Sequence, residues 1–428
     1  MRKTNIAIIG AGASGLMAAY QASVFCKQNK KEICVTVFEG NNRAGKKLLA
    51  TGNGRCNLTN LHVSSEMYHG DRQIDEILKQ ISVEQVLTEF RKIGILCRQD
   101  EVGRVYPYNL QAAAVLKALR QACEENGVLF CYEQKVNSIV QMSKGFLLKI
   151  EKGEEVLADQ CILACGGQAS PKHSCDVNGY TLAQKLGHTI IKLSPALSSV
   201  LCKAKVLSSI KGLRCKAKVK LLGDGLPLYA ESGEVIFADK ALSGICIFNI
   251  SVLVADYIRF GIIQGKKFRQ LSIALDLAED KEQDEIIEYF KHAAMIYPNR
   301  PANELLNGFI NMKVGEELLK TLGFTAHRYL KDLSQHDFMK IAQVVKGWTF
   351  PVVGLPDWDK AQVTAGGVDL KQIDKTTMQS RKVPKLYMTG ELLNVHGDCG
   401  GYNLHFAWIS GILAGQSAAK KQIALGDL

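Results

Sequence analysis

Gly10-Ala11-Gly12-Ala13-Ser14-Gly15 joins an apolar run at residues 5–9 to an Ala-rich stretch at residues 16–25. This is the GxGxxG pattern, in which the first glycine permits a tight turn and the second lets backbone approach a pyrophosphate. The third glycine lets a helix pack closely on a strand. A second apolar run, residues 33–38, ends at Glu39, whose carboxylate is suited to accept hydrogen bonds from ribose hydroxyls. The stretch therefore predicts a βαβ unit that binds a dinucleotide.

The composition of the whole chain is that of a globular protein. The 428 residues are 47% hydrophobic and 22% charged, which excludes a disordered or coiled-coil chain and allows two or three domains. Apolar runs break well before the ~18 residues of a membrane span. The 13 cysteines are an odd number without a CxxC pair, which indicates reduced thiols. We expect a cytoplasmic protein with no membrane contact, no metal and no dithiol relay.

The net charge of +11 permits attraction to anions, and a basic cluster at residues 203–220 stands out. Arg214, Lys216, Lys218 and Lys220 alternate along one predicted strand. The cluster is compatible with an RNA-binding stripe, with an anchor for a nicotinamide 2′-phosphate or an acidic substrate, or with a solvated strand face protected from aggregation. Because no aromatic residue interleaves to stack bases, we favour the solvated face and expect no nucleic-acid partner.

The pattern of the chain changes twice after the first domain. Residues 160–164 form a buried apolar run, residues 195–275 show short alternating strands that include 241–248, and residues 280–345 are helical and charged. Strand and glycine patterns return near the C-terminus. We predict a split nucleotide domain at 1–193 and 346–428, an inserted barrel-like β domain at 194–277 and a helical subdomain at 278–345.

Three further segments favour FAD over NAD. The loop 43–57 combines glycines with Lys and Arg, as in flavoproteins of the glutathione-reductase type, where the corresponding loop follows the cofactor from ribose towards the ring. Residues 164–167 follow the buried run, as a strand does that returns beneath the dinucleotide. Gly390-Glu391 and the glycine-rich loop 400–403 precede a last helix. The start of that helix is placed to stabilise negative charge on a reduced flavin.

These strings together resemble a known family. KKLLATGNGRCNLTN, RVYP, LACGGQASP, TAGGV and GELLNVHGDCGGYNLHFAWISG are similar to those of the YhiN/BaiN-like NAD(P)/FAD-dependent oxidoreductases. That family contains aminoacetone oxidases and 3-dehydro-bile-acid delta(4,6)-reductases. The resemblance spans nearly the whole chain. It implies an α/β fold, a Rossmann-type FAD-binding domain with an inserted antiparallel β-barrel and a helical subdomain.

The resemblance also implies which residues contact FAD. Position by position, they are Gly10, Gly12, Ala13, Ser14, Gly15, Glu39, Lys46, Lys47, Thr51, Gly52, Asn53, Gly54, Arg55, Cys56, Asn57, Ala164, Gly166, Gly167, Gly390, Glu391, Gly401, Tyr402 and Asn403. The chain departs from the family at two positions. Residues 164–167 read Ala-Cys-Gly-Gly where the family usually has ATGG, so Cys165 replaces a threonine. Asn394 stands where relatives usually carry Asp. If that Asp orders a loop or takes part in proton transfer, the role is in doubt in this chain.

Three possible functions follow from the resemblance and the charge pattern. The first is reduction of an enone-type C=C bond, as in a 3-oxo-Δ4,6 steroid or bile acid, with electrons from NAD(P)H through FAD. The second is FAD-dependent oxidation of an amine or aminoketone by O₂. The third is a nucleic-acid-binding flavoprotein. The chain has no second GxGxxG, so a reductase would either dock NAD(P)H transiently against the flavin or take electrons from a partner. We favour the reductase acting on a small molecule.

The proton donor is the least specified part of the site. Tyr402, His396 and His405 surround the final glycine loop and are candidates, since a general acid must lie within hydrogen-bond reach of the reacting atom. Tyr106 is interpreted as a packing residue beside the cofactor, with a substrate contact as the alternative. Residues 364–368 are expected to approach the isoalloxazine. For Cys56 we expect no covalent link to flavin.

Overall fold

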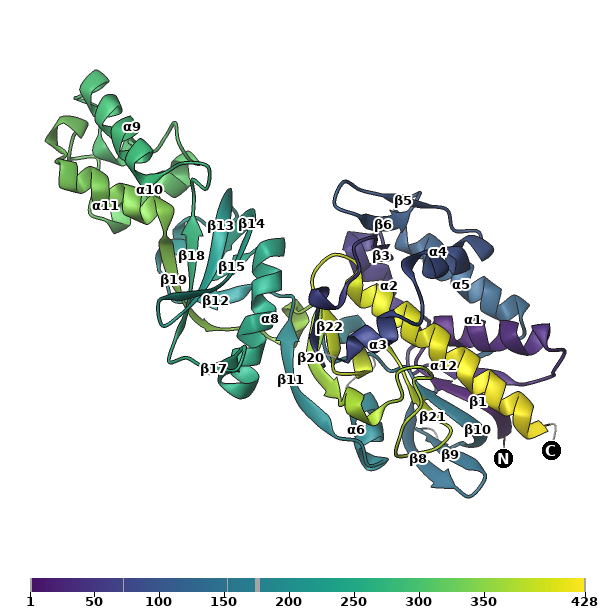
Figure 1. The fold of residues 1–428 in the computed structure, drawn as a ribbon. Coiled ribbons are helices and arrows are strands. Elements are labelled where there is room, and N and C mark those ends of the chain that lie inside the picture. The colour runs from purple at the N-terminus through teal and green to yellow at the C-terminus, as the bar shows by residue number, and fades with distance from the viewer. Residues whose placement is uncertain (1, 72, 152, 174–177, 427–428) are drawn as a thin grey trace. The chain divides into compact units, whose positions relative to one another are not determined.

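The computed structural model describes residues 2–71, 73–151, 153–173 and 178–426. The chain divides into two compact units, Met1–Pro195 with Ala361–Leu428 and Ala196–Lys360. Figure 1 shows both units, with the barrel and helices of the second unit in green and teal.

The first unit contains the split nucleotide-binding fold. In chain order its elements are β1 (Arg2–Ile9), α1 (Ala13–Gln28), β2 (Val35–Phe38), α2 (Lys46–Ala50), η1 (Thr51–Gly54), β3 (Thr59–Asn60), η2 (Ser65–Met67), β4 (Tyr68–Gly70), α3 (Ile74–Leu78), α4 (Val83–Lys92), β5 (Cys97–Gln99), β6 (Arg104–Pro107), α5 (Ala112–Glu125), β7 (Leu129–Cys131), β8 (Val136–Met142), β9 (Gly145–Ile150), β10 (Glu155–Leu163), η3 (Pro171–His173), α6 (Asn178–Lys185), β11 (Ile190–Ala196), β20 (Val363–Val368), η7 (Leu370–Gln372), β21 (Leu386–Met388), η8 (Gly390–Leu392), β22 (Val395–Gly397) and α12 (Tyr402–Gly426).

The main sheet of this unit has the strand order β7-β2-β1-β10-β9-β8, and β21 also pairs with β10. The pairs β7–β2, β2–β1, β1–β10 and β10–β21 are parallel, whereas β9 joins β10 in antiparallel fashion. Both faces of β1 are covered, and Ile6, Ala7 and Ile8 are fully buried. This explains the continuous apolar run in the sequence, because parallel strands covered on both faces lack polar alternation.

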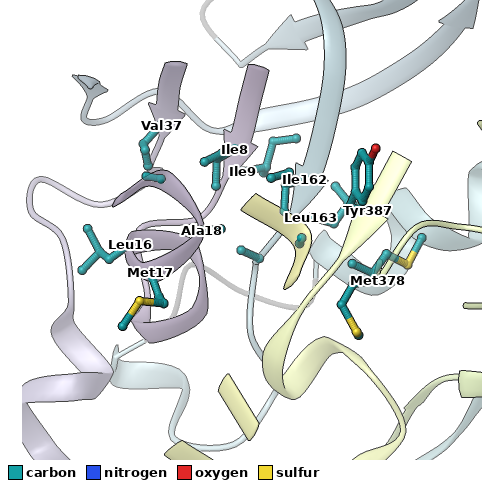
Figure 2. Packing of buried hydrophobic residues seen from close by; sticks show 14 of the residues in the cluster. Ile8, Ile9, Leu16, Met17, Ala18, Val37, Ile162, Leu163, Met378 and Tyr387 are labelled. Carbon is teal, nitrogen blue, oxygen red and sulfur yellow. The ribbon is translucent and has the colours of Figure 1, made fainter. Parts of the chain in front are cut away.

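Figure 2 shows the core of this sheet from close by. Val37 of β2, Ile8 of β1, Ile162 of β10 and Tyr387 of β21 follow one another across the sheet, and α1 with Leu16, Met17 and Ala18 lies on one side of them. Burial of such side chains contributes roughly 25 cal/mol per Å² of apolar surface. The βαβ unit predicted from residues 5–39 is therefore fixed by a shared apolar core.

Helix α12, the last element of the chain, packs along α1 (Figure 1). The two helices meet at glycines of α12. A Cβ on Gly411 would lie 2.6 Å from the carbonyl oxygen of Ser14, and one on Gly415 would overlap the carbonyl oxygen of Ala18. Small residues let the two backbones approach closely, so the C-terminal segment completes the N-terminal domain.

The second unit contains the inserted elements. They are β12 (Val200–Cys202), α7 (Val206–Ser209), β13 (Arg214–Gly223), β14 (Leu226–Ala238), β15 (Ala241–Ser243), α8 (Ile245–Phe260), β16 (Ile262–Ile263), β17 (Lys266–Lys267), β18 (Leu271–Asp276), α9 (Gln283–Ile296), η4 (Ala302–Glu304), α10 (Met312–Thr321), η5 (Leu330–Asp332), α11 (Gln335–Lys346), β19 (Trp348–Gly354) and η6 (Trp358–Lys360). The strands β12-β15-β14-β13-β18-β19 close into an antiparallel barrel. The predicted fold class is confirmed.

Two details differ from the sequence prediction. The apolar run 241–248 is a strand only as far as Ser243; Ile245 begins α8, which ends at the left-handed Gly261. An apolar run can be a buried strand or a buried helix, and periodicity does not separate them. Residues 348–354, assigned from sequence to the split domain, form β19, which pairs with β18 and β12 and closes the barrel. The division into three domains stays a prediction.

Within the described residues, no helix combines the length and apolar character that a membrane crossing requires.

We predict that filling the contact between α1 and α12 destabilises the first unit. Gly415→Leu should lower the free energy of unfolding by about 1–3 kcal/mol, because the added side chain overpacks a backbone contact. Denaturant unfolding followed by circular dichroism measures the change. Ala424→Leu, at an exposed position of the same helix, is the control and should change stability little; equal effects of both would contradict the packing argument.

Candidate functional site

The site begins at the turn between β1 and α1. Gly10 has φ +105°, and Gly12 precedes the first residue of α1 without a side-chain hydrogen bond to cap the helix. The first N–H groups of a helix have no partner inside the helix, and the end that carries them is positively polarised. The turn is therefore suited to hold an anion, as the GxGxxG pattern predicts.

The three glycines of the pattern have three different surroundings. A Cβ on Gly10 would overlap the carbonyl oxygen of Ala164, and one on Gly15 would overlap the carbonyl oxygen of Gly10. A Cβ on Gly12 would meet no atom within 4 Å. Gly10 and Gly15 are thus required by the packing of the protein itself, whereas Gly12 faces open space in which a ligand can approach the backbone.

Glu39 lies at the end of β2, beside this turn. Its Oε2 accepts a hydrogen bond from the Ala11 N–H (2.8 Å), and its Oε1 accepts from the N–H and Nδ2 of Asn41 (both 2.8 Å). Asn41 Oδ1 in turn accepts from Lys46 Nζ (2.7 Å). These hydrogen bonds hold the Glu39 carboxylate in place beside the glycine turn.

A cavity runs from the glycine turn along these residues. Its lining is Ile9, Gly10, Ala11, Gly12, Ala13, Ser14, Phe38, Glu39, Gly40, Asn41, Arg43, Gly45, Lys46, Lys47, Leu48, Thr51, Gln134, Lys135, Val136, Ala164, Cys165, Gly166, Gly167, Asn178, Gly179, Gln362, Val363, Glu391, Val395, Asn403, Leu404, Phe406 and Ala407. All four segments singled out in the sequence contribute to it. The buried Oε1 of Gln134, on this lining, has no hydrogen-bond partner among the residues that the structure describes, which fits a polar ligand group at that place.

The charged group Lys47–Glu391 joins segments that are distant in the sequence. Lys47 Nζ lies 2.6 Å from Glu391 Oε2, and the Thr364 N–H donates to Glu391 Oε1 (2.9 Å). Thr364 Oγ1 accepts from the N–H groups of Gln168 (2.8 Å) and Ala169 (3.0 Å). The segments around 47, 164–169, 364 and 391 therefore form one hydrogen-bonded wall of the site.

The predicted FAD contacts fall into two groups. On the cavity lining are Gly10, Gly12, Ala13, Ser14, Glu39, Lys46, Lys47, Thr51, Ala164, Gly166, Gly167, Glu391 and Asn403. Outside that lining are Gly15, Gly52, Asn53, Gly54, Arg55, Cys56, Asn57, Gly390, Gly401 and Tyr402. Direct contact between FAD and these residues stays a prediction for both groups.

The loop at residues 52–56 has an unusual backbone. Gly52, Asn53, Gly54 and Cys56 all have positive φ angles, between 54° and 82°. Residues 52–55 are exposed, whereas Cys56 is fully buried. Burial raises the pKa of the Cys56 thiol to about 12, so at neutral pH it is not the thiolate that a covalent bond would need.

The three predicted proton donors lie close to the cavity but outside its lining. His405 is buried, and its Nδ1 is 2.8 Å from Thr59 Oγ1. His396 is fully buried in β22, with its ring centroid 5.7 Å from that of His69. Tyr402 opens α12 and accepts, through its carbonyl, a hydrogen bond from Tyr68 OH (2.9 Å).

The pKa shifts separate these groups. Burial lowers the pKa of His405 to about 4, so its imidazole is neutral at physiological pH and cannot supply a proton as imidazolium. Burial, with the nearby Asp398 carboxylate, raises the pKa of Tyr402. Its phenol therefore stays protonated and able to donate.

Sequence reasoning missed residues that only the tertiary structure gathers. Gln134, Val136 and Asn178 line the cavity from β7–β8 and α6, yet none lies in a glycine motif. His69 Nε2 is 2.7 Å from Asp398 Oδ1 because β4 and β22 pair, with His69 opposite His396. His69 and Asp398 are 329 positions apart, and no local sequence pattern indicates their pairing.

The basic cluster on β13 is partly neutralised. Arg214 pairs with Glu234 of β14 (3.0 Å) and Lys218 with Glu279 (3.3 Å). Residues 214, 216, 218 and 220 alternate with the buried Ala217, Val219 and Leu221. These contacts support the interpretation of the cluster as a solvated strand face.

The fold and the cavity define an FAD-dependent oxidoreductase of the Rossmann type. The family described as the HI0933-like protein Rossmann domain matches residues 4–417. The chain is 33% identical over 418 residues to a 3-dehydro-bile acid delta(4,6)-reductase of Clostridium scindens, covering 97% of this chain and 99% of that relative. The protein belongs to the HI0933-like family.

Two other comparisons are informative. A ribosomal RNA dihydrouridine synthase of Escherichia coli is 26% identical over 419 residues, covering 96% of each chain. The solved 3-ketosteroid delta1-dehydrogenase of Sterolibacterium denitrificans is similar in fold, with a TM-score of 0.50, 11% identity and coverage of 98% of this chain and 100% of that one.

We predict that alanine at Gly12 impairs FAD binding, whereas alanine at Gly15 impairs stability. Gly12→Ala should leave the stability of the apoprotein nearly unchanged and weaken FAD binding at least about tenfold, because its methyl group points where the ligand approaches. Gly15→Ala should lower the free energy of unfolding by about 1–3 kcal/mol through overpacking. Flavin fluorescence titration and denaturant unfolding measure the two quantities. Unchanged FAD affinity in Gly12→Ala would disprove close approach at this position.

We predict an acid-dependent loss of stability that originates at His405. Its pKa in the folded state, about 4, is below the ordinary value near 6.5. Between these two pKa values, His405 binds a proton in the unfolded chain but not in the folded chain. The free energy of unfolding therefore falls as the pH drops from about 6.5 to 4. The slope approaches at most ~1.4 kcal/mol per pH unit. His405→Asn should flatten the pH dependence of unfolding, whereas the exposed His62→Asn should preserve it; no difference between them would contradict this origin.

Proposed function

We propose that the protein reduces a C=C bond conjugated to a carbonyl group, with FAD as its flavin and NAD(P)H as the electron donor. The substrate class we favour is an enone such as a 3-oxo-Δ4,6 steroid or bile acid. The observation that carries the proposal is the cavity formed by the glycine turn, Glu39 and the Lys47–Glu391 wall. The 33% identical relative, named as a 3-dehydro-bile acid delta(4,6)-reductase, supports the direction of the reaction.

The residues present fit FAD. The free N–H groups at the start of α1 would hold the pyrophosphate, Glu39 the ribose, and Gln134 a polar group through its unpartnered Oε1. When bound, FAD would supply the redox chemistry, because its flavin accepts and returns a hydride equivalent. The N-terminal end of α12, at Tyr402 and Asn403, is positively polarised and suited to stabilise negative charge near it.

Reduction of an enone adds a hydride equivalent at the β-carbon and a proton at the α-carbon. Tyr402 is the proton donor that we favour. Its raised pKa keeps the phenol protonated, and Tyr402 begins the helix next to the lining residue Asn403. The pair His69–Asp398 lies beside it in the β4–β22 ribbon and would supply a replacement proton to this region.

A second candidate substrate has the same chemistry. The relative that is 26% identical is named as a ribosomal RNA dihydrouridine synthase. The C5=C6 bond of uracil is conjugated to the C4 carbonyl, so its reduction also adds a hydride equivalent at the β-carbon and a proton at the α-carbon. One site can therefore serve either kind of acceptor, and the acceptor decides the biological role.

The half-reactions of the purified holoenzyme test this proposal. Under anaerobic conditions, NADH or NADPH should bleach the flavin, and a 3-oxo-Δ4,6 steroid should restore its colour with a product heavier by two hydrogens. In a parallel experiment, a uridine-containing RNA replaces the steroid as the acceptor that reoxidises the flavin. Bleaching by an amine or aminoketone, with no bleaching by either nicotinamide, would overturn the reductase and support an oxidase.

A further inference from the structure

An exposed aromatic and basic surface lies in the helical part of the second unit. Two segments form it, residues 297–302 after α9 and residues 328–331 at η5. They are joined by hydrogen bonds from the Leu330 N–H to the Arg300 carbonyl (2.9 Å), from the Lys331 N–H to the Pro298 carbonyl (3.0 Å) and from the Ala302 N–H to the Arg328 carbonyl (2.7 Å). We call Tyr297, Asn299, Arg300, Tyr329 and Lys331 the tyrosine surface.

The two tyrosines of this surface are exposed. Tyr297 is 50% exposed and Tyr329 is 42% exposed. The guanidinium carbon of Arg300 lies 4.1 Å from the centroid of the Tyr297 ring, and Lys331 Nζ lies 5.6 Å from that of Tyr329. Aromatic rings and guanidinium planes are the flat groups on which unstacked nucleobases pile. The surface therefore offers two stacking positions, each beside a cation.

The cations of the tyrosine surface are not neutralised. In the described part of the chain no carboxylate pairs with Arg300 or Lys331; Lys331 Nζ donates to the amide oxygen of Asn299 (2.9 Å). By contrast, Lys313 and Lys320 on α10 both contact the carboxylates of Glu316 and Glu317.

Three acids lie in or close to the same segments, namely Glu304 of η4, Asp332 and Asp337. Asp332 accepts the Tyr329 N–H at its Oδ2 (3.0 Å), and Asp337 pairs with Arg328 (2.6 Å). Within the described residues, Arg300 and Lys331 thus form no ion pair of their own and lie beside exposed aromatic rings. That combination complements a single-stranded polyanion with exposed bases.

The basic cluster on β13 fits such a partner less well. Arg214 and Lys218 are paired with Glu234 and Glu279, and no aromatic residue alternates with the cations along residues 214–220. If the second unit contacts a nucleic acid, base stacking is available at the tyrosine surface and not along that strand.

We propose that the tyrosine surface binds single-stranded RNA, with Tyr297 and Tyr329 stacking on bases and Arg300 and Lys331 contacting phosphates. This proposal rests on the second candidate substrate of the proposed function and assigns it a binding surface, and RNA binding is measured without turnover. The 26% identical relative named for ribosomal RNA supports an RNA partner. The tyrosine surface is a different site from the basic cluster at residues 203–220, which is the RNA-binding stripe that the sequence suggests.

The test uses the holoenzyme and a fluorescently labelled single-stranded RNA of about 12 nucleotides, a length within the range of stacking sites. Anisotropy is followed over a range of salt concentrations. The double variant Tyr297→Ala/Tyr329→Ala should bind at least about tenfold more weakly. Arg300→Ala/Lys331→Ala should also reduce the salt dependence of binding, by about 0.7 in the logarithmic slope for each phosphate that the variant no longer neutralises.

Lys216→Ala/Lys220→Ala removes two positive charges from β13 and is the matched control, which should keep most of the affinity. Thermal unfolding and flavin content show that each variant folds. Absence of RNA binding by the wild type at low salt would overturn the proposal, as would loss of binding in the β13 variant with none in the tyrosine variant. Because binding is read without turnover, failure of the reductase proposal leaves this result readable.

Discussion

The backbone contact between the glycine turn and its surroundings is the constraint on which the rest of the first unit depends. Gly15 packs against the carbonyl of Gly10, and Gly10 packs against the carbonyl of Ala164. On the other side, Gly411 and Gly415 of α12 bring that helix onto α1. No side chain fits in any of these contacts. As a result α1 is fixed relative to β1, β10 and α12, and its polarised N-terminal end is held at the mouth of the cavity.

The site draws on both parts of the split domain. The wall around Glu391 and Thr364 comes from the segment after the insertion, whereas Lys47 and the turn at 164–169 come from the segment before it. The site forms only when both segments are present. Because β10 pairs with β1 and β21, the sheet joins the two halves of the chain, and an insertion between them leaves the cavity intact.

The parts of this site that could be predicted are those with a local cause. The glycine turn requires particular backbone geometry, and Glu39 ends a strand of the same βαβ unit, so both appear as short-range patterns. Gln134 and Asn178 could not be found in this way, since the contacts that place them on the lining come from tertiary packing. The pair His69–Asp398 depends on the register of β4 and β22. The run 241–248 was wrong as a strand beyond Ser243, because composition alone did not separate a buried helix from a buried strand.

One FAD held in this cavity is the central claim. Native mass spectrometry of the purified chain, followed by release and identification of the bound molecule, tests the claim most directly. We predict one equivalent of non-covalently bound FAD, released intact on denaturation, and a lower occupancy in Gly12→Ala. Isolation of FMN or of a nicotinamide dinucleotide as the tightly bound molecule, or failure of the apoprotein to take up added FAD, would contradict it.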